Sequence, residues 1–483
     1  MRLNEYAGYD AMGLAELVRG RDIDAAELAR LALAAMEKLN PSLNAVIETY
    51  PERGTSSLAT PVANVPFAGV PFLLKDTGAT EAGKAQSCGS RIGNGYIADT
   101  DAYLTERYKG AGLNILGRST LPEFAQAATT ESIYSGATRN PWNADRSTGG
   151  SSGGAAAAVA SGMVPMAHGT DTGGSIRIPA ACCGLVGLKP SRGRISKGPL
   201  LDETLYGGLN TEHVLTRSVR DTALALDISC QPAPGDPFII PSPARAYVQE
   251  LQRDWEPMRI AVTWQTHTGK PVSSEMAEAT RKIANLCSDL GHRVVEAAPA
   301  FDAEAYAKAD TVVWAYSTAH EVKRLAAATG KPIDARYLER PTLEAMGIAE
   351  QLTLDDWFAA MATYNRMNRD IAGFFGDYDV LITPTVASTA PPLGTLNSNR
   401  DISFHDFMEI TGNFCPHTSI FNVSGQPAIS LPLALSDDGL PIGIQFVARY
   451  GDEACLLRLA AFFEQALPWR DRVPPICASR LKE

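Results

Sequence analysis

The sequence predicts an α/β protein in which one β-sheet takes strands from both ends of the chain. Three observations predict this class. A short apolar run at residues 67–76 is followed by a helical stretch and a second apolar run at residues 113–120. Residues 258–297 have the pattern of a strand, a helix and a strand, and further apolar runs follow residue 378. Such alternation is typical of α/β folds.

Two helices are predicted at the N-terminus. One begins after Asp10 and gathers its leucine and valine side chains on one face, and the other begins near Asp24. We expect the second helix to stop at residues 39–41, Leu-Asn-Pro, because proline cannot continue a helix. Both helices are interpreted as scaffold.

The first strand of the sheet is predicted within residues 67–76, FAGVPFLLKD, which glycine and proline bound as they bound a buried strand. This run ends in Lys75 and Asp76. A helix is expected around residues 102–108, and the next strand at residues 113–120. The order strand, helix, strand predicts neighbouring strands in one sheet.

The middle of the chain contains fewer strand signals. From Ser191 to about Glu250 it is rich in turns and is predicted to be rich in loops. Residues 258–297 then form a β-α-β unit, and residues 301–376 are mostly helical. Strands return at residues 379–385, 427–435 and 442–448. We therefore expect one sheet, with the helical stretch laid across its edge or mouth.

Composition excludes several classes of protein. The chain has 483 residues, of which 45% are hydrophobic and 20% charged, as in ordinary globular proteins. The formal net charge of −11 without a basic run excludes nucleic acid as a main partner. No apolar segment approaches the ~18 to 20 residues that a membrane span needs, and no secretion signal is present. We expect a cytoplasmic protein without membrane contact.

The 8 cysteines and 7 histidines are scattered along the chain. They show neither the density of a disulfide framework nor the spacing of metal ligands. We expect buried, reduced thiols and no metal site.

Residues 146–180, RSTGGSSGGAAAAVASGMVPMAHGTDTGGSIRIPA, contain two glycine-serine clusters. A flexible linker is disfavoured because the apolar, helix-forming stretch between them is typical of a packed segment. A phosphate loop is disfavoured because no lysine follows either cluster. GSSGG also matches a hydrolase elbow with Ser152 as nucleophile, but a polar loop precedes it, and neither His405 nor His417 lies in a recognisable motif. We favour the interpretation that both clusters hold catalytic serines.

The second glycine-serine cluster, residues 169–175, predicts an anion-binding turn at the start of a helix near Ile176. Backbone N–H groups of Thr172, Gly173 and Gly174 would point into one concavity that suits a developing oxyanion. Ser175, at the end of this turn, is the candidate nucleophile.

A serine nucleophile needs a base, and no histidine is obviously placed to serve it. A lysine can substitute where desolvation lowers its pKa. Lys75 is the best candidate, because a buried strand that ends there would deliver its amine to the carboxyl edge of the sheet. Two roles stay open for Asp171 and Arg177: a structural ion pair, or a site in which Arg177 orients a substrate carboxylate.

GGSSGG, GTDTGGSIRIPAACCGLVGLKP and PFLLKD together resemble the motifs of the amidase signature family of C–N hydrolases. The similarity extends to GATRNPWN (136–143), DVLITPT (379–385) and FNVSGQPAISLPLALSDDGLPIGIQ (421–445), and so covers most of the chain. The resemblance implies a twisted mixed β-sheet covered by helices on both faces. It also implies a Ser-Ser-Lys triad, an acyl-enzyme and no metal or organic cofactor.

The resemblance assigns Lys75 as base, Ser151 as proton relay and Ser175 as nucleophile. In the family the relay serine has a cis peptide bond, and the two serines lie 24 positions apart, which selects Ser151 rather than Ser152 here. The chain departs from the family pattern at Ser119 and Thr120, where many members have Thr-Asn, and at Ala155, where serine is common. The first departure puts the polar contacts behind the site in doubt.

The chain is most similar to the branch that opens nylon-type cyclic oligoamides, and related members hydrolyse aryl amides and carbamates. We expect a neutral small-molecule substrate: a linear or cyclic oligoamide, an aryl amide or a carbamate, as for a urethanase. The cavity walls are expected from the loops 127–135 and 199–212 and from a helix near residue 314. The residues expected to contact substrate are Thr129, Thr130, Ser152, Trp314 and Tyr316.

We expect a single domain over residues 1–483, acting as a monomer or homodimer, in which a helical region at about residues 300–376 covers the substrate. One alternative is the glutamine-hydrolysing subunit of a tRNA-dependent amidotransferase, which shares the motifs but needs partner subunits. Another is a non-catalytic protein that uses the glycine-rich turn as an anion site.

Overall fold

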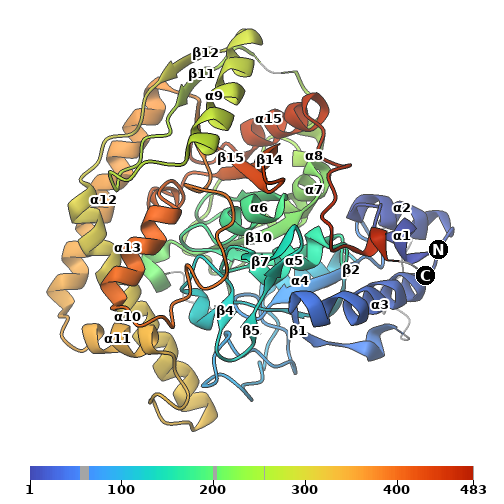
Figure 1. Ribbon diagram of the computed structural model, residues 1–483, viewed down its shortest axis with the longest axis horizontal. Coiled ribbons are helices and arrows are strands. Elements are labelled where there is room, and N and C mark those ends of the chain that lie inside the picture. Colours follow the sequence, from blue (N-terminus) through green and yellow to red (C-terminus); the bar gives the residue numbers. More distant parts are fainter. Residues whose placement is uncertain (55–64, 200–203, 255, 482–483) are drawn as a thin grey trace.

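A computed structural model describes residues 1–54, 65–199, 204–254 and 256–481. At its centre lies an 11-stranded mixed sheet with the order β1-β3-β2-β8-β10-β9-β14-β15-β13-β11-β12 (Figure 1). Its strands are β1 (Val46–Thr49), β2 (Pro71–Lys75), β3 (Asn114–Ser119), β8 (Met166–Asp171), β9 (Val186–Lys189), β10 (Thr211–Thr216), β11 (Arg259–Val262), β12 (Arg293–Glu296), β13 (Val380–Pro384), β14 (Ala428–Leu435) and β15 (Pro441–Ala448). Two short hairpins, β4 (Glu131–Ser132) with β5 (Gly136–Ala137) and β6 (Arg139–Asn140) with β7 (Asn143–Ser147), lie outside it.

Both ends of the chain contribute to this one sheet, as the sequence predicts. β2 pairs in parallel with β3 and β8, and β11 pairs in parallel with β12 and β13. The two halves of the sheet meet where β9 pairs antiparallel with β14, with Lys189 opposite Ala428. Strands from the early and late parts of the sequence therefore share one continuous hydrogen-bonded ladder.

Helices cover both faces of the sheet, so the predicted α/β class is confirmed (Figure 1). α6 packs against β9, β14 and β15, while α7 packs against β10 and α15 against β14. The helices are α1 (Leu3–Tyr6), α2 (Ala11–Gly20), α3 (Ala25–Leu43), α4 (Tyr103–Gly110), α5 (Gly153–Ala160), α6 (Arg177–Cys183), α7 (Val219–Ser229), α8 (Tyr247–Glu250), α9 (Ser274–Asp289), α10 (Ala303–Thr329), α11 (Arg340–Ala349), α12 (Leu354–Asp377), α13 (Phe404–Phe414), α14 (Ile420–Val423) and α15 (Glu453–Ala466).

The apolar stretch between the two glycine-serine clusters forms α5, and every residue of this helix is buried. A helix that is apolar on all sides has no face for water and belongs inside a protein. The chain then returns along β8, which pairs with β2 so that Leu73 lies opposite Ala167. This pairing brings the second cluster, at the end of β8, beside Lys75 at the end of β2.

The predicted end of the second helix is wrong. α3 continues past Pro41 to Leu43, and it ends at Asn44, whose left-handed backbone (φ 50°) lets its N–H donate to the Asn40 carbonyl oxygen at 2.7 Å. Because Pro41 lies in the last turn, it removes one helical hydrogen bond without interrupting the rest of the helix.

The stretch from Ser191 to Glu250 is rich in loops as predicted, but it also contains β10 and α7, which the sequence analysis does not predict. β10 is buried along its whole length although it begins with polar residues, Thr-Glu-His. The buried Glu212 has a polar partner, because its Oε2 lies 2.9 Å from Nε2 of His168 on the neighbouring strand. A buried strand that begins with polar residues lacks the apolar run on which strand prediction depends.

The predicted helical stretch at residues 301–376 contains α10, α11 and α12, which lie on the side of the molecule away from the two chain termini (Figure 1). α10 packs against both α11 and α12. All 8 cysteines are free thiols and buried. Within the described ranges of the chain, no helix combines the length and the apolar character that a membrane span requires.

Candidate active site

Lys75 is the last residue of β2, and its side chain is fully buried. Its Nζ donates hydrogen bonds to Ser151 Oγ at 2.7 Å, Thr170 Oγ1 at 2.8 Å and Ser152 Oγ at 2.9 Å. Burial lowers the pKa of Lys75 to about 7, against the opposing attraction of nearby carboxylates. An amine of this kind is partly neutral at physiological pH and can take a proton from a hydroxyl group.

The first glycine-serine cluster consists of a buried loop, residues 149–152, around a cis peptide bond between Gly150 and Ser151, and the first two residues of α5. The loop is packed closely from one side. A Cβ at Gly150 would lie 2.4 Å from the Thr129 carbonyl oxygen, and the Gly153 N–H donates to Thr130 Oγ1 at 3.1 Å. Residues 129 and 130 therefore hold the loop that carries Ser151.

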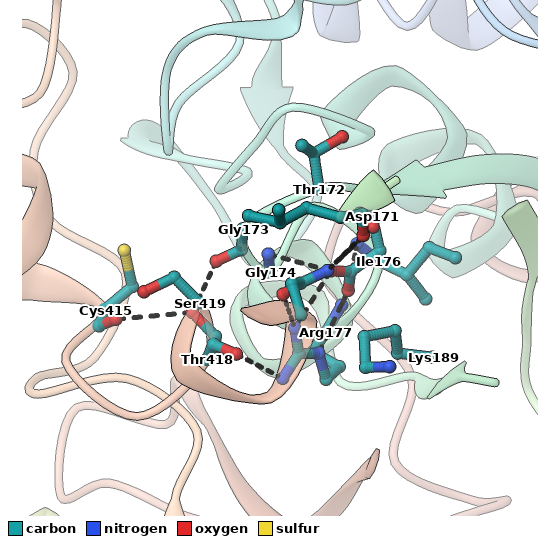
Figure 2. Close-up of polar contacts among 12 residues, drawn as sticks. Asp171, Thr172, Gly173, Gly174, Ile176, Arg177, Lys189, Cys415, Thr418 and Ser419 are labelled. Atoms are coloured by element: carbon teal, nitrogen blue, oxygen red, sulfur yellow. Dashed lines mark hydrogen bonds and ion pairs between the residues drawn. The ribbon is translucent and has the colours of Figure 1, made fainter. Parts of the chain in front are cut away.

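The second cluster is organised around a buried ion pair (Figure 2). The carboxylate of Asp171, the last residue of β8, accepts hydrogen bonds from Arg177 Nη2 at 2.9 Å and Nε at 3.0 Å. It also accepts the N–H groups of Gly174 at 2.8 Å and Ile176 at 3.2 Å. Burial raises the pKa of Asp171, but the charge and hydrogen bonds of Arg177 outweigh this effect and lower the pKa to about 2. The turn therefore surrounds a carboxylate that stays ionised at neutral pH.

Arg177 is fully buried and uses its remaining N–H groups on protein oxygens. Nη1 donates to the Thr418 carbonyl oxygen at 2.9 Å and to Gln445 Oε1 at 2.8 Å, and Nη2 donates to Asn422 Oδ1 at 2.7 Å. With the two bonds to Asp171, all of the guanidinium N–H groups have acceptors. The structural ion pair is therefore the correct interpretation, and the alternative in which Arg177 orients a substrate carboxylate is wrong.

Gly174 does not offer its N–H to the concavity, contrary to what the sequence analysis predicts. Its N–H donates to Asp171 and does not face the concavity to which the sequence analysis assigned it. Its φ of 132° suits glycine alone, and a Cβ there would lie 2.5 Å from Thr418 Oγ1. Gly174 thus gives the turn its shape, while its donor is already satisfied.

The other residues of the turn remain partly exposed: Thr172, Gly173 and Ser175. Thr418 Oγ1 donates to the Gly173 carbonyl oxygen at 2.7 Å and fixes this peptide (Figure 2). In the part of the chain that the structure describes, no protein acceptor takes the N–H of Gly173 or of Ser175. These donors are available to an oxygen that develops negative charge.

Ser175 joins the two clusters and faces an open cavity. Its carbonyl oxygen accepts the N–H of Ser152 at 3.3 Å. Among the described hydrogen bonds, those of the Ser151 hydroxyl run to Lys75 and not to Ser175. Ser151 and Ser152 are fully buried, whereas Ser175 lines the cavity. Of the three serines, Ser175 is the one that a substrate can reach.

The cavity has a volume of about 690 Å³. Gly150, Gly173 and Ser175 line one part of its wall, and Trp314 and Tyr306 of α10 form another part. Its remaining walls include residues 125–128, His267, Asp310, Ser419 and side chains of α13 such as Phe404, Met408 and Glu409. Most of this lining is apolar or neutral.

A second, smaller cavity of about 50 Å³ lies beside Thr170 and Thr172. Leu205, Tyr206 and Asn210 line it, so the described part of the predicted loop 199–212 does contribute to a cavity wall. Residues 200–203 of that loop lie outside the described residues.

Of the five residues predicted to contact substrate, one lines a cavity and four do not. Trp314 lines both cavities, whereas Thr129, Thr130, Ser152 and Tyr316 line neither. The Thr129 hydroxyl donates to Glu131 at 2.7 Å, and the Tyr316 ring packs against Trp357 with 5.9 Å between centroids. Residues two positions apart on a helix point in opposite directions, which explains why Trp314 reaches the cavity and Tyr316 does not.

Tyr306 and Asp310 line the cavity and are not among the predicted site residues. The signal that could have found them is helical spacing: residues 306, 310 and 314 recur every four positions and so share one face of α10. Once Trp314 is taken as a cavity residue, this spacing predicts the other two.

The sequence matches the Amidase family over residues 27–457. It is 39% identical over 477 residues to the 6-aminohexanoate-cyclic-dimer hydrolase of Paenarthrobacter ureafaciens, covering 97% of this chain and 96% of that protein. A solved structure of 6-aminohexanoate cyclic dimer hydrolase aligns with a TM-score of 0.91 at 38% identity, covering 97% of this chain and 99% of that one. A bacterial aryl acylamidase of the amidase signature family aligns with a TM-score of 0.87 at 26% identity, covering 98% and 99%. The chain therefore belongs to the amidase signature family and is an amidase, a hydrolase of carbon–nitrogen bonds other than peptide bonds.

Proposed function

We propose that this amidase hydrolyses neutral small-molecule amides and carbamates through an acyl-enzyme on Ser175, with Lys75 as base and Ser151 as proton relay. The observation that carries the proposal is the environment of Lys75: a fully buried amine whose pKa burial lowers to about 7, at 2.7 Å from the Ser151 hydroxyl. A lysine in water would be protonated and could not act as a base.

In the proposed first step, the Lys75 amine takes the proton of Ser151 while Ser151 takes the proton of Ser175. The Ser175 Oγ then attacks the substrate carbonyl carbon and forms a tetrahedral intermediate. Ser151 gives a proton to the leaving nitrogen and is reprotonated by the Lys75 ammonium, the C–N bond breaks, and the acyl group stays on Ser175. Water releases the acid by the reverse proton path.

The oxyanion is held in this proposal by backbone N–H groups of Thr172, Gly173 and Ser175. The sequence analysis assigned Gly174 as well, but the N–H of Gly174 donates to Asp171. Loss of one such donor typically costs ~2.7–4 kcal/mol in the activation barrier. The permanent charge of Asp171 keeps the turn in the shape that this role needs.

The substrate class follows from the relatives and from the cavity. A relative is named for hydrolysis of a cyclic dimer of 6-aminohexanoate, and a structural neighbour for aryl acylamides. The cavity of about 690 Å³ has room for a ligand of that size and a largely apolar wall. We propose linear or cyclic oligoamides, aryl amides and carbamates, the last as urethanase substrates because their carbonyl carbon undergoes the same attack.

Replacement of the nucleophile tests the proposal. We expect Ser175→Ala to lose turnover of every substrate in a panel of amides, carbamates and esters, while its thermal unfolding stays close to that of the wild type. Ser161→Ala is the matched control, since Ser161 is a buried serine that donates to the Ala158 carbonyl oxygen near the end of α5. Activity that persists in Ser175→Ala would contradict the proposal. Hydrolysis of free glutamine alone would favour an amidotransferase subunit instead.

A further inference from the structure

One face of α10 forms a wall of the main cavity. Tyr306, Asp310 and Trp314 recur every four residues along the helix, and all three line the cavity that also contains Ser175. Asp310 is the carboxylate among these three residues, and along the helix it lies between the two aromatic residues. Its position makes it a candidate for binding a polar group of the substrate.

Asp310 is held by neutral groups only. The Tyr364 hydroxyl donates to its Oδ1 at 3.0 Å, and the Trp314 indole also donates to the carboxylate. Within the described chain, no cationic side chain forms an ion pair with it. Burial raises its pKa to about 6, so that the group is still mainly ionised at neutral pH. The cavity therefore contains a fixed negative charge that the protein does not neutralise.

The other charges around the cavity do not compensate for Asp310. Lys308 pairs with Glu304 at 2.7 Å, and both of these side chains are exposed at the rim. Glu409 adds a further carboxylate from α13. Burial lowers the pKa of His267, which favours its neutral form. The summed charge of the lining is negative, and a cation is the partner that such a site prefers.

We infer that Asp310 binds a primary ammonium group carried by the substrate, and that the preferred substrates are amides with a free amino group at the far end of an alkyl chain. An ammonium at this position forms a charge-assisted hydrogen bond with the carboxylate. The rings of Trp314 and Tyr306 flank the carboxylate and suit a cation, and the apolar walls suit the alkyl chain. This inference rests on the proposed amide hydrolysis, replaces the neutral substrate of that proposal by an amide with a cationic far end, and makes Asp310 a specificity-determining residue.

A purely structural role for Asp310 would be to anchor Tyr364 and so to join α10 to α12. The variant Asp310→Asn separates the two roles. Asparagine keeps an oxygen that accepts the Tyr364 hydroxyl, but it removes the negative charge. The matched control is Glu304→Gln, which removes a rim carboxylate of the same helix whose charge Lys308 already compensates.

The experiment compares two chromogenic substrates, 6-aminohexanoyl p-nitroanilide and heptanoyl p-nitroanilide. Their acyl chains have the same length, but the first ends in an ammonium group and the second in a methyl group. We expect the wild type to favour the amino substrate by about tenfold or more in kcat/KM. Asp310→Asn should lose this preference, and Glu304→Gln should retain it. Equal kcat/KM values in the wild type, or a preference that survives in Asp310→Asn, would overturn the inference.

A binding measurement keeps this test separate from the proposed function. Calorimetry with Ser175→Ala, which we expect not to turn over its ligand, compares 6-aminohexanamide with heptanamide. Tighter binding of the amino amide that disappears in Ser175→Ala/Asp310→Asn supports the inference even if neither nitroanilide is hydrolysed, in which case the proposed function fails alone. Equal binding of the two amides overturns the inference even if both nitroanilides are hydrolysed.

Discussion

The Lys75 amine is removed from water at the end of β2, and this removal decides its protonation state. Three hydroxyl groups surround it, and none of them carries a charge that would stabilise an ammonium ion. Desolvation therefore dominates, although carboxylates at Asp171 and Glu212 oppose it. In our account, this residue turns a pair of serines into a nucleophile and its relay.

The pH dependence of the reaction follows from the direction of this shift. Because the pKa of Lys75 is lowered to about 7, its neutral, reactive fraction grows as the pH rises through that value. We predict that kcat/KM of the wild type rises with pH, reaches half of its maximum at about pH 7 and levels off at higher pH. The measurement is a pH profile with a neutral anilide substrate, whose own protonation does not change in this range.

Lys75→Met provides the corresponding control. The variant should lose activity by about 10²- to 10⁴-fold on the plateau and should lose the rising limb. A wild-type profile that is flat across neutral pH, or a variant with the wild-type rate on the plateau, would remove Lys75 from its role as base.

At this scale the sequence leads more readily to residues that a motif identifies than to residues that a contact identifies. The resemblance to the amidase signature family leads to Lys75, Ser151 and Ser175; the structure brings the first two into contact and puts the third on the cavity wall, while their catalytic roles stay predictions. The sequence contains no sign that the Gly174 N–H is taken by Asp171, because this depends on where a carboxylate turns after folding. Tyr316 fails for a simpler reason, since it points away from the cavity.

Among the elements, α5 sets the distance between the two glycine-serine clusters, and its glycines let it pack at close range. A Cβ at Gly154 would lie 2.3 Å from Thr120 Oγ1 and 2.6 Å from the Ala45 carbonyl oxygen. Neither neighbour can move freely, because Thr120 donates hydrogen bonds to backbone oxygens and Ala45 accepts the Thr120 N–H at 3.0 Å. The small residue is thus required by packing.

We predict that Gly154→Ala lowers the free energy of unfolding by about 1–3 kcal/mol, because the added methyl group overpacks the interface below α5. Gly347→Ala in α11 is the matched control, since nothing lies within 4 Å of its added Cβ. There alanine favours the helix and should raise the free energy of unfolding by about 0.5–1 kcal/mol. Denaturant titration measures both values, and equal effects of the two substitutions would contradict the packing argument.

The elements that the sequence predicts are those with a strong apolar pattern, such as β2, β13 and β15. The sequence does not predict β10, because its first residues are polar and the contact between Glu212 and His168 that accompanies their burial forms only in the folded sheet. The sequence does not predict the end of α3, because a proline in the last turn destabilises a helix less than a proline in its interior does. In both cases tertiary structure overrides the local signal.

Over the whole molecule, one sheet connects the early and late parts of the chain, and one large apolar cluster extends from Tyr6 to Ala478. The sequence predicts that both ends feed one sheet, but not the strand order. The pairing of β9 with β14 joins segments more than two hundred residues apart, and no local pattern encodes such a partner. We propose on this basis that residues 1–483 form a single domain.

This proposal predicts one cooperative unfolding transition. Urea titration followed by far-ultraviolet circular dichroism and by tryptophan fluorescence should give the same midpoint, because Trp142, Trp314 and Trp469 lie in distant parts of one structure. An earlier, separate transition would show that the helical region at residues 300–376 unfolds as a domain of its own.

The account depends most on Ser175 as the atom that attacks the substrate. Labelling of the wild type with a serine-directed fluorophosphonate, followed by digestion and mass spectrometry, identifies the activated hydroxyl directly. We predict a single modification at Ser175, because it lines the cavity while Ser151 and Ser152 are buried. We also predict that Lys75→Met slows this labelling strongly. Modification of Ser151 or Ser152 instead, or no modification of Ser175 in an enzyme that hydrolyses amides, would contradict the account.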